Sequence, residues 1–243
     1  MNEMRDRWDL RARSDAFAYI ETVREVAGLD GFFELGEHFA TVLVDPVLDG
    51  VAQGRALDLG CGLGRVTRAL THRFDEVVGV DVSPEMVRRA EELHPPEQFS
   101  NLTFQATDGV HLPLDADSFD FVFSYEVFQH LPTREVMRRN LAEVARVLRG
   151  NGLSLIHVHR APGPGAYWLA RAKRAVPDPL WTWAKSRVGR DPLTSDATFR
   201  GTAPLRREEI ARLWGSAGLT IVELRDDPTH EPGHRALVAA RRA

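Results

Sequence analysis

Residues 56–65 read ALDLGCGLGR, and residues 77–81 read VVGVD. Each stretch is an apolar run that carries an acid, Asp58 in the first and Asp81 in the second. The first run continues into a turn with glycines at positions 60, 62 and 64. An apolar strand, a glycine-rich turn, a helix and a second strand that ends in a carboxylate are typical of a nucleotide-binding βαβ unit.

The glycine spacing indicates which nucleotide this unit binds. A dinucleotide fingerprint has its third glycine where this chain has Arg65, and here that glycine comes one residue early, as Gly64. Asp81 follows the first glycine by about 20 positions and can accept the hydroxyls of a ribose. Asp58 stands two residues before Gly60, where it can meet a cationic amino group. A ligand with a ribose, an ammonium group and no phosphate fits better than NAD, and S-adenosyl-L-methionine (SAM) is the candidate.

Four further blocks follow in order along the chain. They read GVDVSPEMVRRA (79–90), TDGVHLPLDADSFDFVFS (107–124), YEVFQHLP (125–132) and AEVARVLRGNGLSLIHV (142–158). With these blocks the chain resembles the class I SAM-dependent methyltransferases, particularly the small-molecule group related to the ubiquinone-biosynthesis enzymes. The resemblance implies a doubly wound, Rossmann-like α/β sheet of seven strands, the last one antiparallel, with helices on both faces.

The composition is that of an ordinary globular α/β protein. The chain has 243 residues, 43% hydrophobic and 27% charged, with a net charge of −4, so we expect no general attraction to nucleic acid or anionic membranes. Cys61 is the only cysteine, which excludes an intrachain disulfide. The charged N-terminus does not resemble a signal peptide and no apolar run is long enough to span a membrane, so we expect a cytoplasmic protein without membrane insertion. The sequence does not indicate the oligomeric state.

We expect one methyltransferase domain over residues 1–243. Residues 1–50 form a helical cover, 51–159 the SAM-binding core, 160–203 an insertion or lid, and 204–243 a final helix and strand pair. Within the cover, the candidates to close over the cofactor are Trp8, Arg13 and Tyr19, and packing alone is the alternative for the two aromatic residues. The expected strands are Arg55–Leu59, Glu76–Asp81, Leu102–Ala106, Phe119–Ser124, Leu153–His159, Leu219–Leu224 and Arg235–Ala240.

The insertion at 160–203 is longer than a strand–helix connection needs, which favours a functional role. It is rich in aromatic and basic side chains, namely Tyr167, Trp168, Trp181, Trp183, Arg171, Lys173, Arg174, Lys185, Arg187 and Arg190. Two interpretations stay open. It is either a helical hairpin packed on the sheet edge or a lid that closes over the acceptor.

The resemblance assigns roles to individual residues. The methionine end of SAM is held by Asp58 and the backbone around Gly60 and Gly62, with Cys61 as a small residue packed beside the ligand. The other predicted cofactor contacts are Asp81 for the ribose, Val82 and Met86 flanking the adenine, Asp108 and Gly109 at the adenine edge, and Ser124 through its carbonyl to the ammonium group. No metal ligand set is expected.

His130 is the candidate general base, because it follows the fourth strand at the edge where ligands bind. Glu126, four residues earlier, would orient the imidazole if this stretch forms one helical turn. The alternative is structural: His130 caps the next helix or ties the loop to the core.

The function predicted from these residues is methyl transfer to a small-molecule acceptor, with oxygen or nitrogen favoured, leaving S-adenosyl-L-homocysteine. The alternative is a non-catalytic SAM-binding or partner-regulating protein with the same fold. A nicotinamide oxidoreductase is disfavoured by Arg65. A nucleic-acid enzyme is disfavoured because no Asn/Asp-Pro-Pro-aromatic block follows the fourth strand, and a protein-arginine enzyme because Glu126 and Glu135 do not form its double-glutamate loop.

Overall fold

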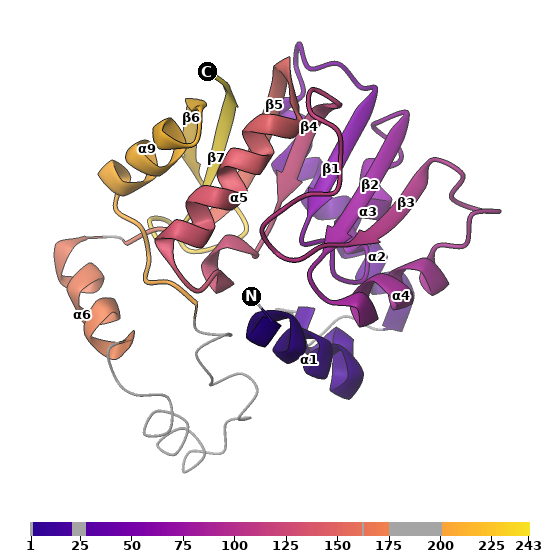
Figure 1. Ribbon diagram of the computed structural model, residues 1–243, viewed down its shortest axis with the longest axis horizontal. Coiled ribbons are helices and arrows are strands. Elements are labelled where there is room, and N and C mark those ends of the chain that lie inside the picture. The colour runs from indigo at the N-terminus through magenta and orange to yellow at the C-terminus, as the bar shows by residue number, and fades with distance from the viewer. Residues whose placement is uncertain (1, 21–27, 162, 175–200) are drawn as a thin grey trace.

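A seven-stranded sheet forms the centre of the protein (Figure 1). The structure, a computed structural model, describes residues 2–20, 28–161, 163–174 and 201–243. The strands run in the order β3-β2-β1-β4-β5-β7-β6, with β7 antiparallel to both of its neighbours. Their bounds are β1 Arg55–Leu59, β2 Glu76–Asp81, β3 Leu102–Ala106, β4 Phe119–Ser124, β5 Leu148–His159, β6 Leu219–Asp226 and β7 Arg235–Arg242. The predicted sheet, including its antiparallel last strand, is confirmed.

The central strands are buried on both faces, which explains their nearly continuous apolar sequences. All six residues of β4, FDFVFS, are buried. Its one acid, Asp120, is compensated: Oδ2 accepts a hydrogen bond from the Arg55 backbone N–H at 2.8 Å and forms an ion pair with Arg149. The strand therefore carries a charge without leaving it unpaired in the core.

Helices cover both faces of the sheet. In Figure 1, α5 (Arg134–Val147) crosses the front beside α9 (Arg207–Ser216), and α2 (Gly28–Phe39) and α3 (Arg65–Leu70) lie behind. Apolar side chains of α5 repeat at i, i+4 and i+7 and pack on the sheet together with Trp214 of α9. At Gly36, α2 approaches α3 so closely that an added Cβ would lie 2.1 Å from the Arg65 carbonyl oxygen.

The remaining helices lie along the edges. α4 (Pro84–Leu93) packs against β2 and β3, and α1 (Asn2–Ile20) packs against α4. Figure 1 shows α1 below the lower edge of the sheet and α6 (Pro164–Arg174) at the far left. Short helical segments complete the described chain at Ala40–Val44, Asp45–Val47 and Phe128–His130. Among the helices of the described residues, none has the length and apolar character needed to cross a membrane.

Two predicted segments lie partly outside the described residues. The first helix, expected within 1–50, is described to Ile20 and has a non-helical residue, Asp15, inside it. Of the insertion at 160–203, residue 162 and residues 175–200 lie outside the description, including Trp181, Trp183, Lys185, Arg187 and Arg190. The division into cover, core, insertion and final pair stays a prediction.

Candidate functional site

The glycine-rich turn after β1 has the backbone geometry that glycine allows. Gly60, Gly62 and Gly64 have φ values of 82°, 54° and 82°. The N–H groups of Gly60 and Cys61 both donate to the Val80 carbonyl oxygen, at 2.7 and 3.0 Å, which fastens the turn to the end of β2. A Cβ at Gly60 would lie 2.2 Å from a methyl carbon of Val127, so this turn needs glycine for space as well as for φ.

Asp81, at the end of β2, faces this turn. Its Oδ2 accepts from the Gly62 N–H at 3.0 Å, and its Oδ1 accepts from the Ser83 N–H at 2.9 Å. Burial raises the pKa of Asp81, and the backbone donors of Ser83, Gly62 and Val82 oppose that rise. A carboxylate has about four acceptor positions, so Asp81 keeps acceptor capacity for a ligand hydroxyl beside these backbone donors.

Asp58 is the second buried carboxylate at the turn. Its Oδ2 accepts from the Thr67 hydroxyl at 2.7 Å. Burial raises the pKa of Asp58 to about 7; the Thr67 hydrogen bond opposes this rise, Asp81 adds to it, and Arg65 also opposes it. A carboxyl with this pKa is poised to lose its proton when a cation binds next to it.

One cavity joins most of the predicted residues. It has a volume of about 1100 Å³ including the space open to solvent. Of the residues predicted for the cofactor, those that line it are Asp58, Gly60, Cys61, Gly62, Asp81, Val82, Met86 and Gly109, and both catalytic candidates, Glu126 and His130, also line it. Asp108 and Ser124 are not among its lining residues.

Asp108 and Ser124 make contacts within the protein. Asp108 Oδ1 accepts from the backbone N–H groups of Val110 and His111 at 2.8 and 2.7 Å, and its Oδ2 lies 2.8 Å from His111 Nδ1. The Ser124 hydroxyl donates to the Leu59 carbonyl oxygen at 2.7 Å. The cofactor roles assigned to these two residues stay predictions.

The residues of the cavity fit SAM. Two carboxylates with remaining acceptor capacity match a ribose diol and an ammonium group, and they disfavour a phosphate ligand by charge. The backbone of the turn at Gly60, Cys61 and Gly62 itself lines the cavity, where it can meet a ligand. Met86 is buried on the wall, where a polarisable thioether suits contact with an aromatic ring.

His130 lies in the short helical turn after β4 and lines the cavity. The Trp8 ring of α1 meets it edge-on, with ring centroids 5.2 Å apart. His130 Nε2 lies 3.2 Å from Gln129 Nε2. The structure thus places the imidazole on the cavity wall, between the sheet edge and α1.

Glu126 lies outside the helical turn that contains His130. Its φ is +60°, a conformation that costs a non-glycine residue free energy and is kept where the surrounding structure holds it in place. Its carboxylate forms an ion pair with Arg235 and lies 3.8 Å from His230 Nε2. The single helical turn expected to join Glu126 and His130 is therefore absent, and the orienting role stays a prediction.

A buried polar network lies behind this wall, and sequence reasoning missed it. Tyr125 lines the cavity, and its hydroxyl donates to Asp227 Oδ2 at 2.9 Å. The Glu126 N–H donates to His157 Nδ1 at 3.3 Å, so the His157 proton is on Nε2, which lies 3.5 Å from Asp227 Oδ2. His230 Nδ1 lies 3.0 Å from the same oxygen. Burial lowers the pKa of His157 well below its usual value, so this ring is neutral.

Arg65 is buried and lines the cavity. From the sequence alone, this residue was only an argument against NAD. Its guanidinium lies over the Phe39 ring at 4.9 Å and near the Phe32 ring at 5.6 Å from the centroids. Contacts of this kind stabilise a partly desolvated cation. Cys61 is buried as well, and burial raises the pKa of its thiol well above the usual value, which suits the predicted packing role better than a reactive one.

Helix α1 covers one side of the cavity through Met4 and Trp8. Asp9 attaches the helix: its Oδ1 accepts from the Ser83 hydroxyl at 2.9 Å and from the Glu85 N–H at 3.0 Å, at the N-terminus of α4. Arg13, expected to close over the cofactor, forms an ion pair with Asp9 at 2.8 Å. The side chain of Tyr19 lies outside the described residues.

Comparisons with known proteins agree with this site. A family model described as a methyltransferase domain matches residues 57–156. The chain is 33% identical over 126 residues to the 2-methyl-6-phytyl-1,4-hydroquinone methyltransferase of Synechocystis sp., covering 51% of this chain and 35% of the relative. It is 33% identical over 90 residues to the ubiquinone biosynthesis O-methyltransferase of Coxiella burnetii, covering 37% and 38%. The chain therefore spans less than half the length of these curated relatives.

The fold has counterparts among solved structures. The magnesium protoporphyrin IX methyltransferase of Synechocystis, solved with bound S-adenosyl-L-homocysteine, superposes with a TM-score of 0.62 at 19% identity and covers 100% of this chain and 99% of that chain. At this identity the likeness shows the fold. Together with the matched methyltransferase domain and the quinone-related relatives, it makes the chain similar to SAM-dependent methyltransferases, a ubiquinone-biosynthesis enzyme among them.

Proposed function

We propose that this protein transfers a methyl group from SAM to an oxygen or nitrogen atom of a small-molecule acceptor. One observation carries the proposal: Asp58 and Asp81, the pair that fits the cofactor, line the same cavity as His130, the candidate base. A protein that only bound SAM would not need an imidazole there.

The cofactor contacts follow from the donors and acceptors of the site. Asp81 accepts the ribose hydroxyls through the lone pairs that Gly62 and Ser83 leave available. Asp58 accepts from the ammonium group. The remaining contacts are proposed for Gly60, Cys61, Gly62, Val82, Met86, Asp108, Gly109 and Ser124.

SAM supplies an electrophilic methyl group on a sulfonium, which is a good leaving group. The residues of the chain then have three tasks: to align the acceptor, to exclude water and to take up a proton. Alignment alone contributes about 7–11 kcal/mol in favourable cases. Trp8 and Met4 of α1 close the cavity wall against solvent. His130 takes the proton of a hydroxyl acceptor as the bond from oxygen to the methyl carbon forms and the carbon–sulfur bond breaks; from an ammonium acceptor it takes the proton first, which frees the nitrogen lone pair for the attack. Glu126 is the proposed orienting partner.

The relatives suggest which acceptors to test. Their printed names include a hydroquinone methyltransferase, a tocopherol O-methyltransferase and a ubiquinone biosynthesis O-methyltransferase, and also an ajmaline N-methyltransferase. We propose phenolic hydroxyls as the first acceptor class and amines as the second.

The test is a transfer assay with methyl-labelled SAM and a panel of hydroquinones, phenols and amines. We expect labelled product from at least one class and a fall of about 10²–10⁴ in kcat for His130→Asn, with loss of the ascending limb of the pH–rate profile. Calorimetry on the same variant is expected to show unchanged SAM affinity. Tight SAM binding without transfer to any acceptor would favour the non-catalytic alternative, and a retained pH limb would return His130 to a structural role.

A further inference from the structure

Helix α6 presents apolar side chains to solvent. Trp168 is 62% exposed and Leu169 is 57% exposed, and these are the two most exposed large hydrophobic side chains of the described residues. The helix reads PGAYWLARAKR and contains three cations and no acid. An exposed Trp–Leu pair on a purely cationic helix is unusual for a surface that faces only water.

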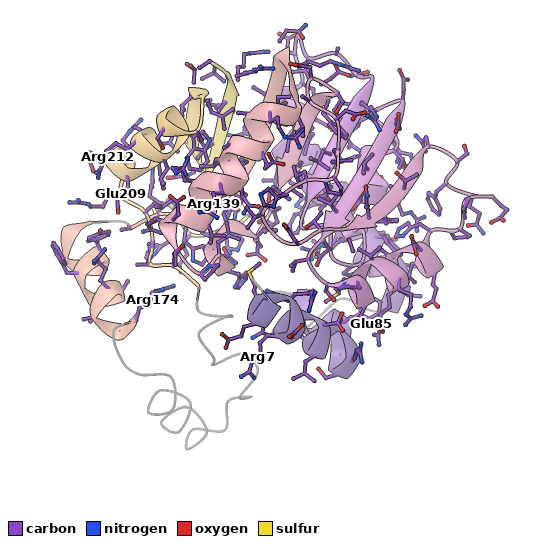
Figure 2. The ribbon with its side chains drawn as sticks, viewed as in Figure 1. Arg7, Glu85, Arg139, Arg174, Glu209 and Arg212 are labelled. Carbon is purple, nitrogen blue, oxygen red and sulfur yellow. The ribbon has the colours of Figure 1, made fainter. Side chains whose placement is uncertain are left out.

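The inner side of α6 is fixed to the rest of the protein. Tyr167 is buried, and its hydroxyl donates to Glu209 Oε1 of α9 at 3.3 Å. The Arg206 guanidinium lies 4.7 Å from the centroid of the Tyr167 ring. Arg174 donates from Nε to the Gly201 carbonyl oxygen at 3.2 Å and points toward the body of the molecule (Figure 2). These contacts set which side of α6 faces outward.

The outward side has an apolar centre with a cation at each border. At 3.6 residues per turn, Trp168, Leu169 and Ala172 share this side, and Arg171 and Lys173 flank it. Both flanking cations are exposed. Arg171 also donates from Nη1 to the Tyr167 hydroxyl at 3.3 Å, which holds its chain alongside Trp168. We call these five residues the α6 face.

We propose that the α6 face docks on the surface of an anionic lipid bilayer. An indole ring is favoured at the boundary between headgroups and acyl chains, and flanking cations pair with anionic headgroups. The occupant must be anionic to match the charge of the face, and apolar beneath its surface to accept Trp168 and Leu169. A bilayer that contains anionic lipid satisfies both conditions. The net charge of −4 of the whole chain does not prevent this, because charges farther away than about 10 Å are screened by salt.

Because α6 closely follows β5 in the chain, docking of α6 would also position the nearby edge of the sheet. The helix begins at Pro164, shortly after β5 ends at His159, and β5 leaves the sheet next to the network behind the cavity wall. Docking of the α6 face would hold this edge of the sheet near the membrane surface. The inference rests on the α6 face alone and does not depend on the acceptor.

The test is flotation of the purified full chain with vesicles of phosphatidylcholine, alone or mixed with phosphatidylglycerol. We expect binding to the mixed vesicles, which weakens as the ionic strength rises, and little binding to phosphatidylcholine alone. Arg171→Gln/Lys173→Gln is expected to weaken binding about 25-fold, at about fivefold for each cation. Trp168→Ser/Leu169→Ser is expected to weaken it by at least about tenfold.

Matched controls use exposed residues elsewhere. Val222→Ser removes an apolar side chain that is 54% exposed on β6, and Arg138→Gln/Arg139→Gln removes two cations from α5. Both controls are expected to bind vesicles as the wild type does. SAM affinity by calorimetry checks that every variant is folded, since no residue of the α6 face lines the cavity.

Three outcomes would overturn the proposal. They are equal binding of the wild type to both vesicle types, equal loss in the control variants, and a change of oligomeric state in Trp168→Ser/Leu169→Ser by sedimentation analysis. The last outcome would make the α6 face a contact between copies of the chain. None of the three concerns methyl transfer, so failure here is distinguishable from failure of the proposed function.

Discussion

The affinity of this protein for SAM should depend on pH through Asp58. Burial raises the pKa of this carboxyl to about 7 in the protein without ligand. An ammonium group beside it favours the ionised form and lowers the pKa in the complex. Binding therefore selects the deprotonated carboxylate, and affinity should rise with pH up to about pH 7 and level off above it.

The size of the effect follows from the pKa. At about pH 5 roughly one protein in a hundred carries Asp58 ionised, so affinity should be about 100-fold below the plateau, or about tenfold per pH unit. A carboxyl with the ordinary value of 3.8 would give almost no change over this range. Thr67→Val removes the hydroxyl that donates to Asp58 Oδ2 and should move the midpoint to higher pH.

Calorimetric titration with SAM at several pH values measures this dependence, and repetition in buffers of different ionisation enthalpy counts the protons released. We expect nearly one proton released per SAM bound at about pH 6 and fewer above pH 7. The same titration of Asp58→Asn measures the protons that SAM itself releases, and this value is subtracted from that of the wild type. The affinity of this variant for SAM should no longer rise with pH. An affinity in the wild type that stays flat from about pH 5 to pH 7 would refute the assignment of Asp58 to the ammonium group.

Three further perturbations test the rest of the site. Asp81→Ala should weaken SAM binding by about 1.5–3 kcal/mol, the scale for hydrogen bonds to a charged group, and unchanged affinity in calorimetry would remove Asp81 from the cofactor site. Gly60→Ala places a Cβ 2.2 Å from Val127 at a φ of +82°, and it should lower the melting temperature or the SAM affinity. The control Gly215→Ala, whose Cβ would have no atom within 4 Å, should change neither quantity. Asp9→Ala removes the acceptor that holds α1 to α4 and should speed proteolysis within α1. Arg13→Ala, which removes only the ion pair with Asp9, should change the cleavage rate little. Equal cleavage rates for the wild type and Asp9→Ala would contradict this attachment.

The sequence predicted the sheet well, because its signals are local. The first four strands have the predicted bounds. β1, β2 and β4 are largely buried apolar runs, and β3, a more exposed edge strand, alternates apolar and polar residues. Ser83 caps α4, with its hydroxyl oxygen accepting from the Met86 N–H at 3.2 Å, and a serine just before Pro84 is a local signal for a helix start. Strand β5 begins earlier than predicted, at Leu148, because that residue already pairs with Phe119 of β4. Pairing of this kind depends on a distant strand and leaves no local pattern.

The meeting of the glycine turn with Asp58 and Asp81 was predictable for the same reason, and the contacts of Tyr125 and Arg65 were not. The glycines, Asp58 and Asp81 lie within one βαβ unit of fixed geometry. Tyr125 and Asp227 are 102 positions apart and meet only through the sheet order. Arg65 was visible in the sequence, but its contact with Phe39 depends on how α2 approaches α3. Side chains that meet across the fold carry no spacing signal along the chain.

The sequence similarity to known methyltransferases covers only part of the candidate site. The matched domain, residues 57–156, contains both cofactor carboxylates and His130. It does not contain Trp8, which contacts His130, or Arg235, which pairs with Glu126. The wall beside the candidate base is therefore completed by α1, and Glu126 on that wall is held by Arg235 of β7; both α1 and Arg235 lie outside the match. A domain cut to the matched residues would keep Asp58, Asp81 and His130 and lose Trp8 and Arg235. If the proposed methyl transfer is right, we expect changes in α1 and at Arg235 to alter which acceptors react.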